Sequence, residues 1–163
     1  MKKFLILLAG LFVGFAAFAQ DLDAQYATEL LAPGTPAPEI TLEDVSGNTV
    51  SLSSFQGRPV VLVFWASWCP DCRAEVPALK ELRAAHPEVA FVSVSFDRTR
   101  EAFESYVKDN GMDWTQLFDP TGMKSSPVGA AYHIKWIPSM YLIAPDGTIS
   151  LGTVMLDKLA KRL

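Results

Sequence analysis

Hydrophobic and polar positions change their spacing several times along this chain. Two segments, "RPVVLVFWAS" at residues 58–67 and "VAFVSVSFD" at residues 89–97, are continuous apolar runs rich in β-branched residues. A strand with one face in water alternates apolar and polar residues, whereas a strand covered on both faces does not need to. The two runs therefore predict neighbouring strands in the middle of a buried sheet.

Helical spacing of apolar residues follows each of these runs. One predicted helix extends from Cys69 or Pro70 to about Ala85, and a second ends at Asn110-Gly111, a typical C-terminal stop. Shorter helices are expected within "SSPVGAAYHI" and at the closing "LDKLAKRL". The apolar positions of the two longer helices are Val76, Leu79 and Leu82, then Phe103, Tyr106 and Val107.

Two hairpins complete the pattern. Alternating residues flank "EDVSGN", which predicts a hairpin at the edge of the sheet, and "PSMYLIAPDGTISLG" predicts two strands joined at Pro145-Asp146-Gly147. In order, the chain has a front hairpin, a β-α-β half and a β-β-α half. We therefore predict an α/β fold, a central mixed sheet with helices on both faces and an extra N-terminal β-hairpin.

The N-terminus has the pattern of a secretory signal peptide. Lys2 and Lys3 precede an apolar run that ends in Ala17-Phe18-Ala19, with small residues at the two positions that a signal peptidase recognises. The run is short for a membrane span, which needs about 20 apolar residues. We expect cleavage between Ala19 and Gln20 and an exported, periplasmic protein; an uncleaved anchor helix is the alternative.

The remaining chain has the length of one domain. We assign residues 1–19 to the signal peptide, 20–38 to a lead-in or linker, and 39–163 to the domain, and we expect a monomer. Cleavage removes two lysines, which takes the formal net charge from −4 to −6. Nucleic acid and anionic membranes bind clustered Lys and Arg, so this charge argues against both as partners.

The two cysteines of the chain stand three positions apart, in "FWASWCPDC". A C-x-x-C pair can be a redox centre, half of a metal site or a structural staple. A staple that closes so short a loop removes little chain entropy. A metal site needs more ligands, and the spacing of His86 and His133 matches no zinc motif. We therefore interpret the pair as a redox centre.

The predicted helix suggests a separate task for each cysteine. Cys69 stands at the helix N-terminus, where the helix dipole and unpaired N–H groups lower the pKa of a thiol, so it is the predicted attacking residue. Cys72, one turn further on and more deeply buried, is the predicted resolving thiol. Pro70 suits a first helical position, and Trp68 adds apolar bulk beside the pair.

The order of these elements resembles thioredoxin, and most closely the exported TlpA/ResA-like family. The resemblance spans residues 33–163 and is carried by "VVLVFWASWCPDCRAEVP", "YHIKWIPSMYLIAPDG", the front hairpin and the signal peptide. It implies a thiol–disulfide oxidoreductase with no cofactor beyond the Cys69–Cys72 disulfide. It also implies a cis peptide bond before Pro138, and Trp68, Pro70, Ile137 and Pro138 as the residues that bind substrate.

Two residues near the cysteines depart from the thioredoxin pattern. Thioredoxins resemble one another in a buried aspartate on the first central strand, and Val63 occupies that position here. The TlpA/ResA-like family instead suggests Glu75, which is three residues after Cys72 and so on the same helix face. A poorly solvated carboxyl would have a raised pKa and could transfer protons. Asp71 stands where the family usually has proline, which leaves the redox direction open.

The resemblance also implies partners. They would be exported proteins that contain cysteines, with apocytochrome c as one candidate, and a membrane electron donor or acceptor. A peroxiredoxin-like peroxidase is one alternative, although Ala66 stands where a peroxide-binding threonine or serine would be expected. A partner-binding module without turnover is the other. We expect a reductant, as the family's reductive duties imply.

Overall fold

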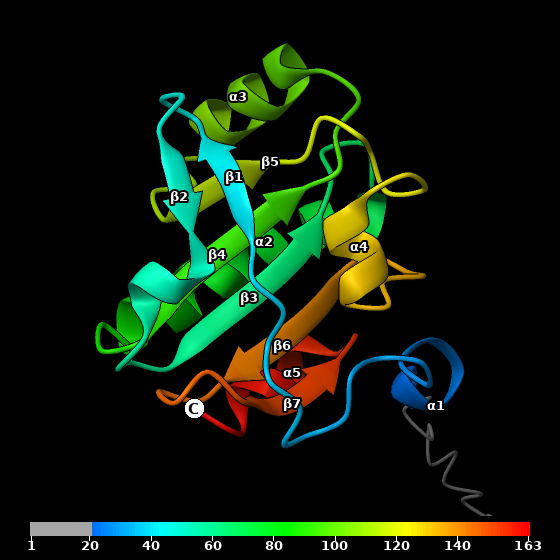
Figure 1. Ribbon diagram of the computed structural model, residues 1–163. Coiled ribbons are helices and arrows are strands. Elements are labelled where there is room, and N and C mark those ends of the chain that lie inside the picture. The colour runs from blue at the N-terminus through cyan, green and yellow to red at the C-terminus, as the bar shows by residue number, and fades with distance from the viewer. Residues whose placement is uncertain (1–20) are drawn as a thin grey trace, which may run out of the picture.

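A computed structural model describes residues 21–163, and within them the strands form one mixed seven-stranded sheet in the order β2-β1-β5-β4-β3-β6-β7 (Figure 1). The strands are β1 (Thr41–Asp44), β2 (Thr49–Ser51), β3 (Val60–Trp65), β4 (Ala90–Ser95), β5 (Thr115–Phe118), β6 (Ser139–Ile143) and β7 (Ile149–Thr153). The helices are α1 (Asp23–Tyr26), α2 (Pro70–Ala85), α3 (Arg100–Asp109), α4 (Pro127–Ala131) and α5 (Leu156–Ala160), with a 3₁₀ turn η1 (Leu52–Phe55).

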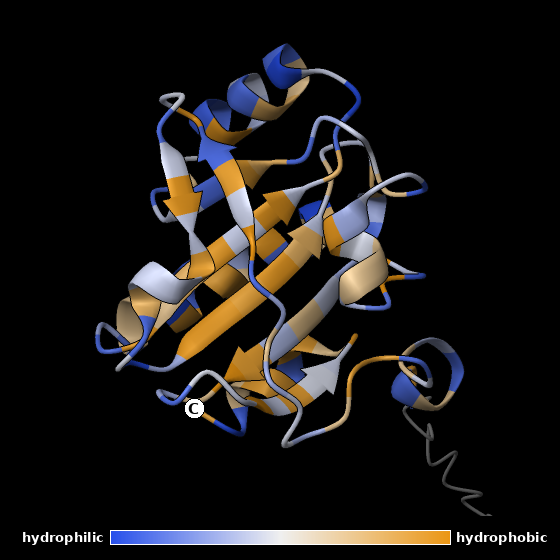
Figure 2. Cartoon of the chain, viewed as in Figure 1, coloured by the Kyte–Doolittle hydropathy of each residue, from blue (hydrophilic) through white to orange (hydrophobic). Residues whose placement is uncertain are grey.

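The two apolar runs form the centre of the sheet, as predicted. β3 pairs in parallel with β4, from Val60 opposite Ala90 to Trp65 opposite Ser95. Every residue of both strands is buried, and both strands are coloured as hydrophobic along most of their length in Figure 2. On its other side β3 pairs antiparallel with β6, and Phe64 lies opposite Ser139. The end of β3 that leads to Cys69 therefore lies beside the start of β6, which follows Pro138.

Helices cover both faces of the sheet. In Figure 1, α2 crosses behind β3 and β4 whereas α4 lies in front. Neighbouring residues of β3 alternate between these layers: Val63 lines a cavity with residues of α2, and the Phe64 ring packs 5.2 Å from Tyr132 at the end of α4. The helix α5 contacts α2, so it belongs to the same layer. Helix α2 continues through Pro77 without a break.

Strand β5 is missing from the sequence-based prediction. It is only four residues long, and its second residue, Gln116, is polar although it is 1% exposed. Such a short segment gives no clear alternation, so its pattern does not distinguish a strand from a loop. β5 pairs with β4 on one side and β1 on the other, and it thereby attaches the front hairpin to the sheet. The predicted edge position of that hairpin is confirmed, with β2 outermost.

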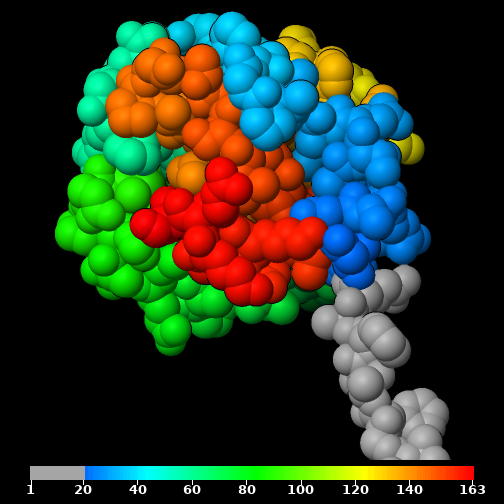
Figure 3. Space-filling view, turned by 90° about the horizontal axis from the view of Figure 1, so that it is seen from below, coloured from blue at the N-terminus to red at the C-terminus, as the bar shows by residue number. Residues whose placement is uncertain are grey.

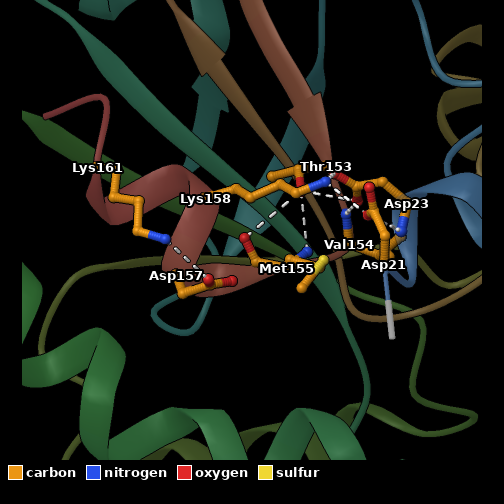
Figure 4. Close-up of polar contacts among 8 residues, drawn as sticks. All are labelled: Asp21, Asp23, Thr153, Val154, Met155, Asp157, Lys158 and Lys161. Atoms are coloured by element: carbon orange, nitrogen blue, oxygen red, sulfur yellow. Dashed lines mark hydrogen bonds and ion pairs between the residues drawn. The ribbon is translucent and has the colours of Figure 1, made fainter. Parts of the chain in front are cut away.

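The segment predicted to be a lead-in packs against the C-terminal part of the domain. Figure 3 shows it, in blue, against the orange and red C-terminal elements. Asp23 accepts hydrogen bonds from the Val154 N–H and the Thr153 hydroxyl, each at 2.8 Å. Lys158 Nζ donates to Asp23 at 2.8 Å and to Asp21 at 2.6 Å (Figure 4). These contacts attach the start of the described chain to β7 and α5.

The predicted signal peptide and its cleavage site, Ala19–Gln20, lie outside the described residues. Within residues 21–163, no helix has both the length and the apolar character that a membrane crossing requires.

Candidate active site

The two cysteines form a disulfide at the N-terminus of α2. Their Cα atoms are 5.3 Å apart, and the Cys72 backbone N–H donates to Cys69 Sγ at 3.2 Å. Cys69 is thus the N-cap of the helix, and its sulfur lies among N–H groups that have no partner within the helix. This environment favours a negative charge on Cys69 once the disulfide is reduced. The expected difference in burial is small, since Cys69 is 4% and Cys72 is 3% exposed.

Four residues predicted to bind substrate surround this pair. The Ile137–Pro138 peptide bond is cis, and the Ile137 carbonyl oxygen lies 3.6 Å from Cys69 Sγ. Pro70 is the first residue of α2 and is exposed, and Trp68 is 51% exposed although it is a large apolar side chain. Exposed aromatic surface next to a reactive sulfur suits a site that receives another polypeptide. The predicted role of these residues stays a prediction.

A small cavity lies beneath the disulfide. Its volume is about 10 Å³, and its walls include Val63, Trp65, Cys72, Glu75 and Pro138. Glu75 Oε2 and Trp65 Nε1 are buried there and have no hydrogen-bond partner among the described residues. Glu75 therefore reaches the cavity from α2. Val63 of β3, which also lines the cavity, occupies the position of the thioredoxin aspartate. A carboxyl group is present beside the buried cysteine, although it comes from the helix rather than the strand.

The surroundings of Glu75 favour its neutral form. Burial raises the pKa of Glu75 from 4.5 to about 7, with further contributions from the negative charges of Asp71 and Asp157. Asp71 stands one turn before Glu75 on α2, and Asp157 comes from α5, which packs on α2. A carboxyl group with a pKa near neutrality can both accept and donate a proton at ordinary pH. The sequence suggested the raised pKa from burial but not the contribution of α5.

Asp97 is a further residue of this site that the sequence analysis did not single out. It is 1% exposed at the end of β4, and it accepts hydrogen bonds from the Ser67 hydroxyl at 2.7 Å and the Ser67 N–H at 3.1 Å. The Ser95 hydroxyl donates to it at 2.8 Å. Asp97 therefore fixes the loop that carries Trp68 and Cys69. The sequence contained a signal for Asp97, which is an acidic residue just after a buried strand. The carboxyl ends of neighbouring parallel strands meet at one edge of a sheet, so such a residue is expected near the segment that follows β3.

A third tryptophan near the site, Trp136, packs against the lead-in on one face. The Trp136 ring stacks on Tyr26 of the lead-in with centroids 4.2 Å apart, and Trp136 remains 38% exposed. The two histidines lie apart from the cysteines: His86 caps the end of α2, and His133 Nδ1 contacts the Glu29 carbonyl oxygen at 2.9 Å. Within residues 21–163, no group of three or more His, Cys, Asp or Glu side chains is placed to hold a metal ion.

Solved structures and curated proteins show which class this fold and site define. The thioredoxin domain of a thiol-disulfide oxidoreductase from Bacteroides vulgatus superposes with a TM-score of 0.74 at 32% identity, over 81% of this chain and 95% of that one. The thiol-disulfide oxidoreductase ResA of Oceanobacillus iheyensis is 32% identical over 160 residues, which are 95% of this chain and 81% of the relative. The chain is thus a TlpA/ResA-like protein of the thiol–disulfide oxidoreductase class, and it has the thioredoxin-like fold predicted from its sequence.

The sequence profile of the AhpC/TSA family matches residues 33–151, and the chain belongs to that family. The soluble secreted antigen MPT53 of Mycobacterium tuberculosis is 36% identical over 110 residues, or 68% of this chain. The matched part spans 61% of the antigen's own length.

Proposed function

We propose that this chain is an exported thiol–disulfide oxidoreductase that reduces disulfides in partner proteins. The observation that carries the proposal is the position of Cys69, whose sulfur accepts the Cys72 N–H at the start of α2 and lies next to the Ile137 carbonyl. The Cys72 N–H and the helix N-terminus stabilise a thiolate at Cys69, next to the exposed side chains of Trp68 and Pro70. Cys69 is the proposed nucleophile and Cys72 the proposed resolving residue.

The proposed reaction begins with the reduced protein. The Cys69 thiolate attacks one sulfur of the partner's disulfide, and a bond forms between Cys69 and that sulfur. The partner's other sulfur leaves with the electron pair and takes up a proton. Cys72 then loses its proton and attacks Cys69 Sγ, which releases the partner's first sulfur as a second thiol. The partner is reduced by two electrons, and the Cys69–Cys72 disulfide forms.

Glu75 is the proposed proton acceptor for Cys72. Both residues line the same cavity, and the raised pKa of Glu75 allows its carboxyl to exchange protons near pH 7. The cavity volume of about 10 Å³ is about that of one water molecule, which would connect the carboxyl to the sulfur. In the opposite direction, when an electron donor reduces the disulfide, the neutral carboxyl would return a proton to Cys72.

The direction and the partners follow from the family resemblance. Reductive duties of the TlpA/ResA-like family support a reductant whose substrates are exported proteins with cysteines, apocytochrome c being one candidate, and whose own disulfide is reduced by a membrane electron donor. Export is supported by the signal-peptide pattern and by the similarity to a secreted antigen. After cleavage between Ala19 and Gln20 the protein would be periplasmic.

A peroxidase is the alternative with less support. The Ala66 side chain, three residues before Cys69, is buried and has no hydroxyl group to polarise a peroxide. The nearest hydroxyl, that of Ser67, is engaged by Asp97 at 2.7 Å. The relative from Oceanobacillus iheyensis and the solved structure from Bacteroides vulgatus are both named as thiol-disulfide oxidoreductases.

Insulin reduction with dithiothreitol tests the proposal. The wild-type protein is expected to accelerate precipitation of the insulin B chain, and Cys69→Ala is expected to abolish the acceleration. Cys72→Ala is expected to accumulate a mixed disulfide with the substrate. Turnover of hydrogen peroxide with no insulin reduction would contradict the proposal and favour the peroxidase. If the wild-type protein and Cys69→Ala both bind a partner and neither reduces it, a partner-binding module without turnover would be favoured.

A further inference from the structure

A groove separate from the cavity beneath the disulfide is lined in part by Trp68. Its volume is about 320 Å³, and its lining includes Trp68, Phe96, Arg98, Thr121, Met123 and Lys124. The Phe96 ring is 1% exposed and forms part of the apolar floor, whereas Trp68 stands in the wall. Because Trp68 is the residue directly before Cys69, this groove adjoins the attacking sulfur.

Two buried carboxylates hold the loops that form the groove. Asp97 binds the N–H and hydroxyl of Ser67, the residue before Trp68. Asp119, which is 2% exposed, accepts the Thr121 N–H at 2.9 Å and also the hydroxyl groups of Thr121 and Ser126. Each carboxylate is thus occupied by groups of the protein itself. The groove is fixed before any ligand arrives, which reduces the entropy lost on binding.

The charged side chains that line the groove are both cations, although the chain as a whole is acidic. Arg98 and Lys124 are exposed at its rim, and neither forms an ion pair within residues 21–163. The complete chain has a formal net charge of −4. Asp97 and Asp119 are buried and accept hydrogen bonds from the protein itself, so the charged groups that a ligand can contact in the groove are the two cations. Two cations without ion pairs around an apolar floor complement a segment that combines apolar and acidic side chains.

We propose that this groove binds the polypeptide next to the reactive cysteine of a substrate protein and selects an apolar residue accompanied by carboxylates. The inference names the substrate class of the proposed oxidoreductase and therefore rests on that function. A substrate whose sulfur is bonded to Cys69 passes Trp68 within a few residues, since an extended chain advances about 3.3 Å per residue. The Trp68 ring and Phe96 contact the apolar residue, and Arg98 and Lys124 attract the acidic ones.

A matched pair of peptides tests the groove. Each contains one cysteine as a mixed disulfide with neutral 4-thiopyridine and one leucine, and the peptides differ only in flanking glutamates or flanking lysines. The reduced protein attacks the peptide sulfur, an S–S bond forms to Cys69, and 4-thiopyridine leaves with the electron pair. Release of 4-thiopyridine gives the rate. In parallel, 4,4′-dithiodipyridine reports the reactivity of Cys69 without any peptide.

The glutamate peptide is expected to react about three- to tenfold faster than the lysine peptide at low salt, with the ratio falling towards one as salt screens the charges. Arg98→Glu combined with Lys124→Glu is expected to reverse the preference after each peptide rate is divided by the same variant's rate with dithiodipyridine, which corrects for any change in the reactivity of Cys69. The control combines Lys108→Glu with Arg162→Glu, which change the net charge equally outside the groove, and it should keep the preference. Circular dichroism verifies that the variants are folded.

Each result distinguishes this inference from the proposed function. Equal rates for the two peptides would show that the groove does not select between them. Loss of the preference in the control variant as well as in the groove variant would also overturn the groove as the selective surface. Absence of reaction with dithiodipyridine in the wild-type protein would instead overturn the proposed oxidoreductase. Replacing leucine by serine in the glutamate peptide should slow the reaction, and an unchanged rate would contradict the apolar contact with Trp68 and Phe96.

Discussion

The Glu75 carboxyl shares a buried cavity with Cys72, one turn away on α2, and its Oε2 atom has no hydrogen-bond partner among the described residues. Ionisation of such a carboxyl is unfavourable, because burial reduces its contact with water and no donor group binds Oε2. The raised pKa of about 7 follows from this position. Proton transfer to and from Cys72 is a role that would explain why an ionisable group is present in this unfavourable position.

Replacement of Glu75 by glutamine tests that role in the kinetics. In the wild-type protein, attack of Cys72 on a mixed disulfide at Cys69 should accelerate as pH rises through about 7, where Glu75 becomes able to accept the proton. Glu75→Gln should slow this step about ten- to a hundredfold near pH 7 and remove the inflection. Single-turnover release of a thiol from the mixed disulfide measures it. Glu81→Gln, an exposed change on the same helix, is the control and should behave as the wild type.

The same group makes a prediction about stability in the oxidised protein, where the cysteines do not titrate. Between pH 4.5 and about 7 the folded protein retains a proton on Glu75 that the unfolded chain has lost, so the free energy of unfolding falls as pH rises. Relative to Glu75→Gln, the free energy of unfolding of the wild type should fall by about 2 kcal/mol across this window. This value is discounted because Glu75 is partly exposed. Above pH 7 the difference between the two proteins should change little more. Urea unfolding at a series of pH values measures the difference. Parallel curves for the two proteins would show that the Glu75 pKa is not raised.

Asp157 offers a way to change the Glu75 pKa without touching the active-site helix. Its negative charge on α5 contributes to the raised pKa, after burial and Asp71. Asp157→Asn should therefore move the kinetic inflection to lower pH while the plateau rate stays the same. The pH profile of thiol release measures the shift. Asp109→Asn makes the same charge change on α3 and should leave the inflection in place; an equal shift in both variants would indicate a general charge effect.

The docked lead-in contributes to stability through Asp23. Its carboxylate accepts the Val154 N–H and the Thr153 hydroxyl, and Val154 is 5% exposed, so removal of the carboxylate leaves a buried donor without a partner. Asp23→Ala should lower the free energy of unfolding by about 2 kcal/mol. Asp21→Ala removes an exposed ion pair with Lys158 and an exposed hydrogen bond from the Asp23 N–H, and it should change stability much less. Denaturant unfolding of both variants gives the comparison, and equal effects would argue against the buried contacts.

Patterns that extend over many residues were sufficient to predict the frame of this protein. The two apolar runs, the helix from Pro70 to Ala85 and the C-terminal hairpin all lie where hydrophobic spacing indicated them. The cysteine pair at the start of a helix also follows from the sequence, because the two sulfurs and the helix N-terminus are local features. The cis bond before Pro138 required the family resemblance, since most X–Pro bonds are trans.

Contacts between distant segments could not be predicted in this way. β5 is too short to show a period, and only its pairing with β1 and β4 defines it as a strand. The attachment of the lead-in depends on Asp23 meeting β7 and α5, which are about 130 residues away in the sequence. Asp97 and Ser67 meet because β3 and β4 end at the same edge of the sheet. Each of these contacts depends on the assembled sheet rather than on its local sequence.

The reduction potential of the Cys69–Cys72 pair determines whether this protein acts as a reductant. Equilibration with glutathione or dithiothreitol at pH 7, followed by separation of the oxidised and reduced forms, gives the value. A reductant should have a potential near that of thioredoxin, about −270 mV. A potential near that of DsbA, about −120 mV, would make the protein an oxidant and contradict the account.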